Sequence, residues 1–181
     1  MTSLQEERYW KGPDELSTKT VTGFNAKGFF CKALVRDKNR KPVESWPGVG
    51  GSCVELFFDF RTAESGLGSA PYAKGVAQVV VKPALKAGEK AELWLAGSTS
   101  QLYKGLEVSG EPDGQFGYWV AIFVPWNAVD ETGKAPEAIG FDAGIDGAWA
   151  DKPGRKSQIF LFGKASNNQD ASGFGLGRLA K

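Results

Sequence analysis

The last third of the chain consists of short apolar runs, each closed by glycine, proline, aspartate or asparagine. From Ile139 to Ile145 every second residue is apolar, and the residues between them are glycine and aspartate. A period of two is that of a β-strand with one buried face. No stretch keeps apolar residues at helical spacing over three turns without a glycine or proline. The pattern therefore predicts an all-β protein.

Comparable runs occur along the rest of the chain. The 24 glycines and 9 prolines are spread evenly, which indicates many turns and many short elements. Strands at this spacing are typical of an antiparallel β-sandwich. The length of 181 residues fits a single domain over 1–181 with its own core. Strands are predicted at residues 28–36, 53–60, 76–82, 91–96, 116–124, 139–145, 158–162 and 174–179.

Charge and hydropathy narrow the range of partners. The net charge is +1 and both signs are mixed along the chain, so the basic patch that nucleic acid or an anionic membrane requires is missing. There is no apolar run of about 18 residues to span a membrane, and the first residues lack the basic-then-apolar pattern of a signal peptide. We expect a module of a longer secreted protein, extracellular or periplasmic; a cytoplasmic protein is the alternative.

The sequence contains no histidine. This removes the commonest general base, the commonest metal ligand and any Ser-His-Asp triad. Met1 is the only methionine, which argues against haem, and no cofactor is predicted. A metal would have to be bound by carboxylate oxygens, so a structural calcium ion stays open beside the alternative of solvated loop acids. The candidate ligands are Glu55, Asp142, Asp146, Asp151 and Asp170.

Carboxylate pairs are the remaining candidates for catalysis. Glu55 and Asp59 lie on one face of a predicted strand, and so do Asp142 and Asp146 if their strand extends that far. Four residues along a strand span roughly 13 Å, whereas the two carboxylates of a glycosidase lie about 5 to 9.5 Å apart. Neither pair fits alone, so the protein is predicted not to be an enzyme. A pair from neighbouring strands stays open as the catalytic alternative, and otherwise Asp59 and Asp146 are expected to cap turns.

The two cysteines, Cys31 and Cys53, fall in predicted strands that follow one another in the sequence. A cross-strand disulfide and a pair of buried thiols both fit this placement.

Two of the six tryptophans lie in predicted loops. Trp46 and Trp149 have glycine, proline and aspartate as neighbours, whereas Trp94, Trp119 and Trp126 lie in or beside strands and are expected in the core or on a sheet surface. An exposed indole offers a flat apolar face on which a sugar ring can stack, with polar neighbours binding its hydroxyl groups. The alternative for Trp46 and Trp149 is that each covers an open end of the sandwich.

Several short segments stand out by their order and spacing along the chain. They are residues 35–37, Trp46, 52–59, 77–79, 124–126, 139–142, Asp146, 154–155 and 174–175. Together these segments resemble the family 9 carbohydrate-binding modules, which belong to a wider group of DOMON-like β-sandwiches. The resemblance covers most of the chain from about Trp10 onward.

The resemblance implies a noncatalytic module, often attached to a glycoside hydrolase, that clamps a glycan between two tryptophans beside an acidic residue. Trp46 is similar to the first tryptophan, Glu55 to the acidic residue, and Gln78 to a glutamine on the neighbouring strand. The second tryptophan would fall near Asn168. The sequence departs from the family there, and also at three further positions: Ser52 stands for an aspartate, and Val80 and Lys82 stand for arginine and asparagine.

From these observations we expect a noncatalytic module of a secreted polysaccharide-degrading protein, binding a glycan or oligosaccharide. The expected site consists of Trp46, Glu55, Gln78 and Asn168, with Trp149 as a substitute platform. The alternative is a structural or protein-interaction β-sandwich whose sugar site is degenerate.

Overall fold

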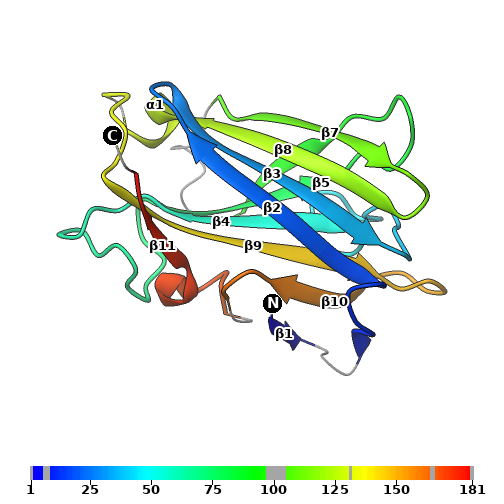
Figure 1. Cartoon of the computed structure of the whole chain (residues 1–181). Coiled ribbons are helices and arrows are strands. Elements are labelled where there is room, and N and C mark those ends of the chain that lie inside the picture. The colour runs from blue at the N-terminus through cyan, green and yellow to red at the C-terminus, as the bar shows by residue number, and fades with distance from the viewer. Residues whose placement is uncertain (1, 6–8, 97–104, 131, 164–165, 180–181) are drawn as a thin grey trace.

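The computed structural model describes residues 2–5, 9–96, 105–130, 132–163 and 166–179. Two antiparallel sheets pack face to face as a sandwich (Figure 1). This confirms the predicted fold class. No helix in the described ranges is long and apolar enough to cross a membrane.

The larger sheet has seven strands and carries the site. Its strand order is β1-β10-β9-β4-β5-β6, and β11 pairs with the other end of β9. The central strand β4 lies between β9 and β5. The bounds are β1 Thr2–Gln5, β4 Cys53–Asp59, β5 Val76–Lys82, β6 Glu92–Ala96, β9 Ala138–Ala148, β10 Arg155–Phe160 and β11 Gly175–Arg178.

The smaller sheet has four strands in the order β2-β3-β8-β7. One helical turn, α1, follows β8 directly, and a 3-10 turn over Ala171–Gly173 precedes β11. The bounds are β2 Leu16–Phe24, β3 Gly28–Asp37, β7 Glu107–Asp113, β8 Gly117–Pro125 and α1 Trp126–Val129.

The main core lies between the two sheets, and every second residue of the strands points into it. Phe58 on β4 is fully buried there and packs against Phe29, Phe60 and Phe141, with ring centroids 5.4 to 5.8 Å apart. The apolar residues of 139–145 all face this core, as their alternation predicts.

The outer face of the large sheet is also covered at its centre. All seven residues of β4 are buried, so the strand has no solvent-exposed face. Phe57, Phe160 and Phe174 form a second apolar cluster there, and Val43, Cys53 and Val80 form the buried part of a third. The segments 43–49 and 166–174 therefore fold back over this face, and the site lies between them.

The eight predicted strands are confirmed, and most of the strand ends differ from the prediction by one to three residues. Three strands were not predicted: β1, β2 and β7. β7 contains Gly110 and Pro112 and has acidic residues on its exposed face, which is the composition of an edge strand.

Cys31 and Cys53 are free, buried thiols in different sheets. Their predicted strands follow one another in sequence but do not pair, because the chain crosses from β3 in the small sheet to β4 in the large one. Burial raises the pKa of the Cys31 thiol to about 12 and also raises that of Cys53. Of the two alternatives left open by the sequence, the pair of buried thiols is confirmed.

Replacing Phe58 by alanine should lower the free energy of unfolding by about 3 to 5 kcal/mol, because it leaves a cavity among three other rings. The measurement is urea denaturation followed by tryptophan fluorescence. Phe162→Ala is the matched control, since Phe162 is 60% exposed, and it should cost less than about 1 kcal/mol. Equal losses for the two variants would contradict this description of the core.

Candidate functional site

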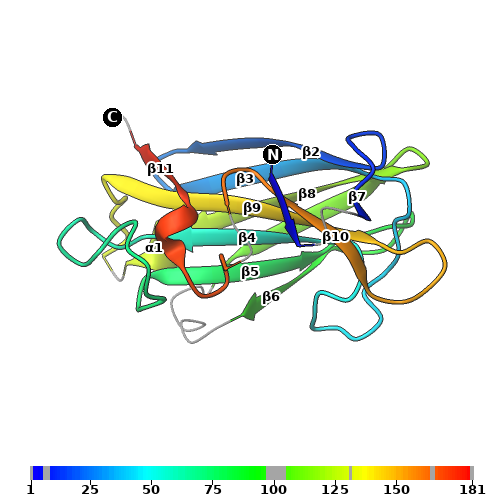
Figure 2. The same cartoon turned by 90° about the horizontal axis from the view of Figure 1, so that it is seen from below.

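A groove of about 530 Å³ lies on the outer face of the large sheet. Figure 2 is a view toward this face, with β6, β5, β4 and β9 side by side. The floor comes from β4, β5, β6 and β10, while Val49 and residues 166–169 form its borders. The lining residues are Val49, Glu55, Phe57, Gln78, Trp94, Ala96, Arg155, Gln158, Phe160 and 166–169.

Glu55 is the central acidic group of this floor. Strand alternation turns its side chain away from the core, yet the side chain is only 5% exposed because neighbours surround it. Oε2 accepts a hydrogen bond from the side-chain amide of Gln78. Oε1 accepts one from the amide of Gln158 at 2.7 Å and one from Arg155 Nη1 at 3.1 Å. Glu55 therefore holds three donor side chains, one from the neighbouring strand β5 and two from β10 on the far side of β9.

Arg155 joins Glu55 to a second carboxyl group. Its Nη1 lies 3.1 Å from Asp146 Oδ1 as well as 3.1 Å from Glu55 Oε1. Asp146 is fully buried, and Cys53 Sγ lies 3.0 Å from its Oδ2, within hydrogen-bond distance. Burial raises the pKa of Asp146 well above its ordinary value of 3.8, and the nearby charge of Glu55 raises it further, while Arg155 lowers it. Asp146 therefore keeps its proton to a higher pH than a free aspartate does, and Arg155 lies within ion-pair distance of both carboxyl groups.

Gly144 makes room for this arrangement. It lies on β9 directly opposite Glu55 on one side and Phe160 on the other. A Cβ atom at this position would lie 3.0 Å from the Phe160 ring and 3.4 Å from the Gln158 amide nitrogen. A larger residue would crowd the path by which Gln158 reaches Glu55.

Trp94 supplies the apolar part of the groove. Its place opposite Val80 on β5 puts the indole on the outer face, while Leu93 and Leu95 point toward the core. Trp94 is partly buried, and like Trp46 and Val49 it packs against the cluster around Val80. The indole therefore lies at the β6 edge of the groove.

The structure brings three of the five predicted site residues together. Glu55, Gln78 and Asn168 all line the groove. Trp46 does not line it; this residue is partly buried against the cluster around Val80, and Lys82 Nζ lies 5.6 Å from its ring centroid. Trp149 lies outside the groove in the β9–β10 hairpin loop, against Tyr9 at 5.0 Å between ring centroids.

Arg155, Gln158 and Trp94 were not predicted as site residues. Trp94 was expected in the core or on a sheet surface, which is where it lies. The alternation from Glu92 to Ala96 shows which residues share its face, but the sequence does not show that this face is hollow. Arg155 and Gln158 reach the groove across β9 from a separate hairpin, a contact that no local pattern signals.

The candidate metal ligands do not converge. Within the described ranges there is no group of three or more acidic or cysteine side chains arranged to hold a metal ion. Asp142 accepts a hydrogen bond from Asn167 at 2.5 Å, and Asp170 caps the 3-10 turn by accepting from the Ser172 N–H at 2.9 Å. Asp146 does not cap a turn as expected, because it lies inside β9.

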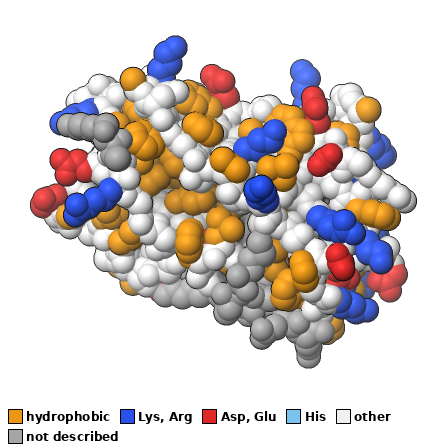
Figure 3. Space-filling view, viewed as in Figure 1, with side chains coloured by type: hydrophobic (Ala, Val, Ile, Leu, Met, Phe, Trp, Pro, Cys, Tyr) orange, Lys and Arg blue, Asp and Glu red, His pale blue; other side chains and the backbone are white. Residues whose placement is uncertain are grey.

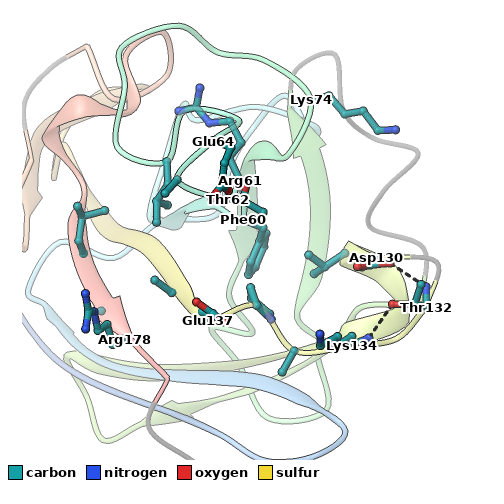
Figure 4. Close-up of a pocket in the computed structure, with 18 residues that line it drawn as sticks. Phe60, Arg61, Thr62, Glu64, Lys74, Asp130, Thr132, Lys134, Glu137 and Arg178 are labelled. Carbon is teal, nitrogen blue, oxygen red and sulfur yellow. Dashed lines mark hydrogen bonds between the residues drawn. The ribbon is translucent and has the colours of Figure 1, made fainter.

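A larger hollow of about 1220 Å³ lies at one end of the sandwich, between the loop after β4, residues 129–130 and 132–138, and β11 (Figure 4). Its charged side chains are of both signs, and several have partners. Arg61 pairs with Asp59 at 2.8 Å, and Asp130 accepts from the Thr132 N–H at 2.8 Å. Its described lining includes no tryptophan and none of the predicted site residues. The groove over β4 is therefore the stronger candidate site.

Two solved structures of family 9 carbohydrate-binding modules from Caldicellulosiruptor kristjanssonii share this architecture. The module in complex with glucose has a TM-score of 0.69 and 17% sequence identity, over 94% of this chain and 80% of that one. The module in complex with cellotriose has a TM-score of 0.69 and 18% identity, over 93% and 77%. No family model and no curated protein sequence matches the chain. The chain has the family 9 carbohydrate-binding module fold, as the resemblance implied.

The Asp146→Asn variant should have a flatter pH dependence of stability. A carboxyl whose pKa is higher in the folded state keeps its proton where the unfolded chain has lost it, so folding stability falls as the pH rises above 3.8. Asparagine has the shape of the protonated acid and does not ionise. As the pH rises, the free energy of unfolding of the variant should therefore fall less steeply than that of the wild type, by up to about 1.4 kcal/mol per pH unit.

Urea denaturation at intervals between about pH 4 and 7 measures this slope. The control is Asp151→Asn, on an exposed loop residue, which should keep the wild-type slope. Asp37 and Asp142 also have pKa values raised by burial, so part of the slope should remain in both variants. An unchanged slope for Asp146→Asn would contradict the raised pKa of Asp146.

Proposed function

We propose that the protein is a noncatalytic carbohydrate-binding module that holds a glycan in the groove over β4. One observation carries this proposal: a partly exposed indole, Trp94, shares the groove with the side chains of Gln78, Arg155, Gln158 and Asn168. Sugar sites combine an apolar surface with a few placed polar groups. The two solved neighbours, which share the fold, contain glucose and cellotriose.

In this proposal Trp94 is the stacking surface and the amides bind hydroxyl groups. A side-chain amide has two N–H donors and one carbonyl acceptor. Gln78 and Gln158 each donate to Glu55, which fixes their orientation. The second N–H and the carbonyl oxygen of each amide then supply hydrogen bonds to a hydroxyl, a group that also both donates and accepts.

Glu55 accepts three hydrogen bonds from protein groups, so we propose that it orients the donors and accepts at most one sugar hydroxyl. Trp46 is assigned a supporting role, since it packs against the same buried cluster as Trp94. The charged side chains of the described groove lining are Glu55 and Arg155, which pair with each other at 3.1 Å, so the site suits an uncharged glycan.

The carboxyl groups do not support hydrolysis. Glu55 and Asp146 share Arg155 Nη1 and come from neighbouring strands, so they are the cross-strand pair that the catalytic alternative required. Asp146 is fully buried and forms no part of the groove lining. A glycosidase needs both carboxyl groups at the scissile bond, about 5 to 9.5 Å apart with the sugar between them.

We further propose that the module acts within a secreted polysaccharide-degrading protein, extracellular or periplasmic, beside a glycoside hydrolase domain. A competing proposal is a structural or protein-interaction domain. It is favoured by the position of Trp46 and Trp149, neither of which lines the groove. Without a second indole, a bound sugar ring would be stacked on one side only.

Isothermal titration with cello- and xylo-oligosaccharides tests the proposal. Trp94→Ala should weaken binding at least tenfold, that is by about 1.4 kcal/mol or more, because it removes the stacking surface. Trp149→Ala is the matched control and should bind as the wild type does, since this indole lies outside the groove.

Trp46→Ala distinguishes direct stacking from support. A supporting role predicts a weaker effect than Trp94→Ala, whereas loss of all binding would make Trp46 the main platform. Absence of binding by the wild type to any of these glycans would favour the interaction-domain proposal. Equal affinity of Trp94→Ala and the wild type would remove the groove as the sugar site.

A further inference from the structure

The outer face of the small sheet, on the opposite side of the molecule from the groove, carries an unusual set of exposed side chains. Phe30 is 42% exposed, Val21 47% and Leu34 37%, and all three point away from the core. Trp119 and Phe123 on β8 lie directly beside Leu34 and Phe30 and are partly exposed. We define these five residues as the apolar stripe of the small sheet. An apolar surface of this kind on a soluble protein marks an interaction site.

Charged residues on the two sides of the stripe have opposite signs. On β2 and β3 the outward charged residues are Lys19, Lys32 and Arg36. Across the sheet on β7 they are Glu107, Glu111 and Asp113. Apolar and basic side chains lie side by side over β2 and β3 in the space-filling view (Figure 3). The outward face is therefore basic over β2 and β3, apolar over β3 and β8, and acidic along the β7 edge.

This distribution is self-complementary. In a dimer with twofold symmetry the same patch is used twice, so each part must match the part that the symmetry axis brings opposite to it. When two such faces meet about an axis parallel to the strands, β7 of one copy lies over β2 of the other, and β8 lies over β3. We propose that the small sheet is the interface of a homodimer with this geometry.

The pairing register fixes which residues meet. Lys19, Leu34, Trp119 and Glu111 form one row across the four strands, in the order β2, β3, β8 and β7. The twofold axis places Glu111 over Lys19 of the second copy, and Trp119 over Leu34. Counting only outward-pointing residues, Phe30 and Phe123 lie two rows away from Leu34 and Trp119. In the dimer, Phe30 of one copy lies over Phe123 of the other.

The size of the face is that of a weak dimer. Four strands spaced about 4.8 Å apart, over about seven residues each, cover roughly 450 Å² per copy. The total of about 900 Å² is in the range of weak, transient interfaces, so we expect a dissociation constant on the order of 10 to 100 µM. Lys32 Nζ lies 4.1 Å from the Trp119 ring centroid and covers part of the indole in the monomer.

Sedimentation velocity between about 5 and 500 µM protein tests the dimer. The wild type should change from monomer to dimer over this range, and the dimer should weaken as salt is added, since surface ion pairs are screened. Glu111→Lys and Lys19→Glu should each raise the dissociation constant about tenfold or more, because each places two like-charged pairs across the interface. Lys86→Glu, on an exposed loop, is the matched control.

A mixture of the two charge-reversal variants gives the sharpest result. In the mixed dimer one contact joins the two changed residues and the other keeps the original Lys19 and Glu111, so both contacts again join opposite charges. The mixture should dimerise about as well as the wild type, although each variant alone does not. Circular dichroism and thermal unfolding confirm that both variants are folded.

Three outcomes would overturn the proposal. The wild type could stay monomeric up to the highest concentration. A dimer could form that neither variant weakens, which would place the interface elsewhere. Finally, a monomer could bind insoluble cellulose through this face, with binding lost in Trp119→Ala, which would make the stripe a polysaccharide surface.

Discussion

The site depends on Arg155, which pairs with two carboxyl groups, those of Glu55 and Asp146. Both carboxyl groups lie on the outer face of the neighbouring strands β4 and β9, and this strand pair is buried on both of its faces. A carboxylate removed from water costs several kcal/mol unless it is paired and hydrogen-bonded. Glu55 meets this condition with three donors, and Asp146 meets it with hydrogen bonds from Arg155 and Cys53. The position of every polar side chain in the groove floor follows from this pairing.

In our proposals the two outer faces of the molecule have different roles, and on each sheet strand alternation separates the outward residues from those of the shared core. On the large sheet, inward residues of β4 build the core while Glu55 and Phe57 build the groove. On the small sheet, inward residues of β3 build the same core while Phe30 and Leu34 form the apolar stripe. A dimer through the small sheet leaves two grooves facing away from each other, so a dimer could bind two glycan segments.

The sequence predicted the fold better than the site. The alternation from Ile139 to Ile145 predicted β9. A strand with one face in the core alternates apolar and small or polar residues, and this local pattern can be recognised without knowing which strands pair with it. β7 was missed, since an edge strand has few buried side chains and tolerates Gly110 and Pro112. Glu55 and Gln78 were predicted from a resemblance and lie together, but Arg155 and Gln158 reach Glu55 from a hairpin 100 or more positions away in sequence. Such a contact depends on the order of strands in the sheet.

The most direct test of the central claim is an NMR titration with cellotriose that follows side-chain amide and indole N–H signals. The account predicts that the signals of Trp94, Gln78 and Gln158 shift together with one dissociation constant, while those of Trp149 and Trp119 stay in place. Shifts confined to Trp149, to Trp119 or to the hollow at the end of the sandwich would contradict it.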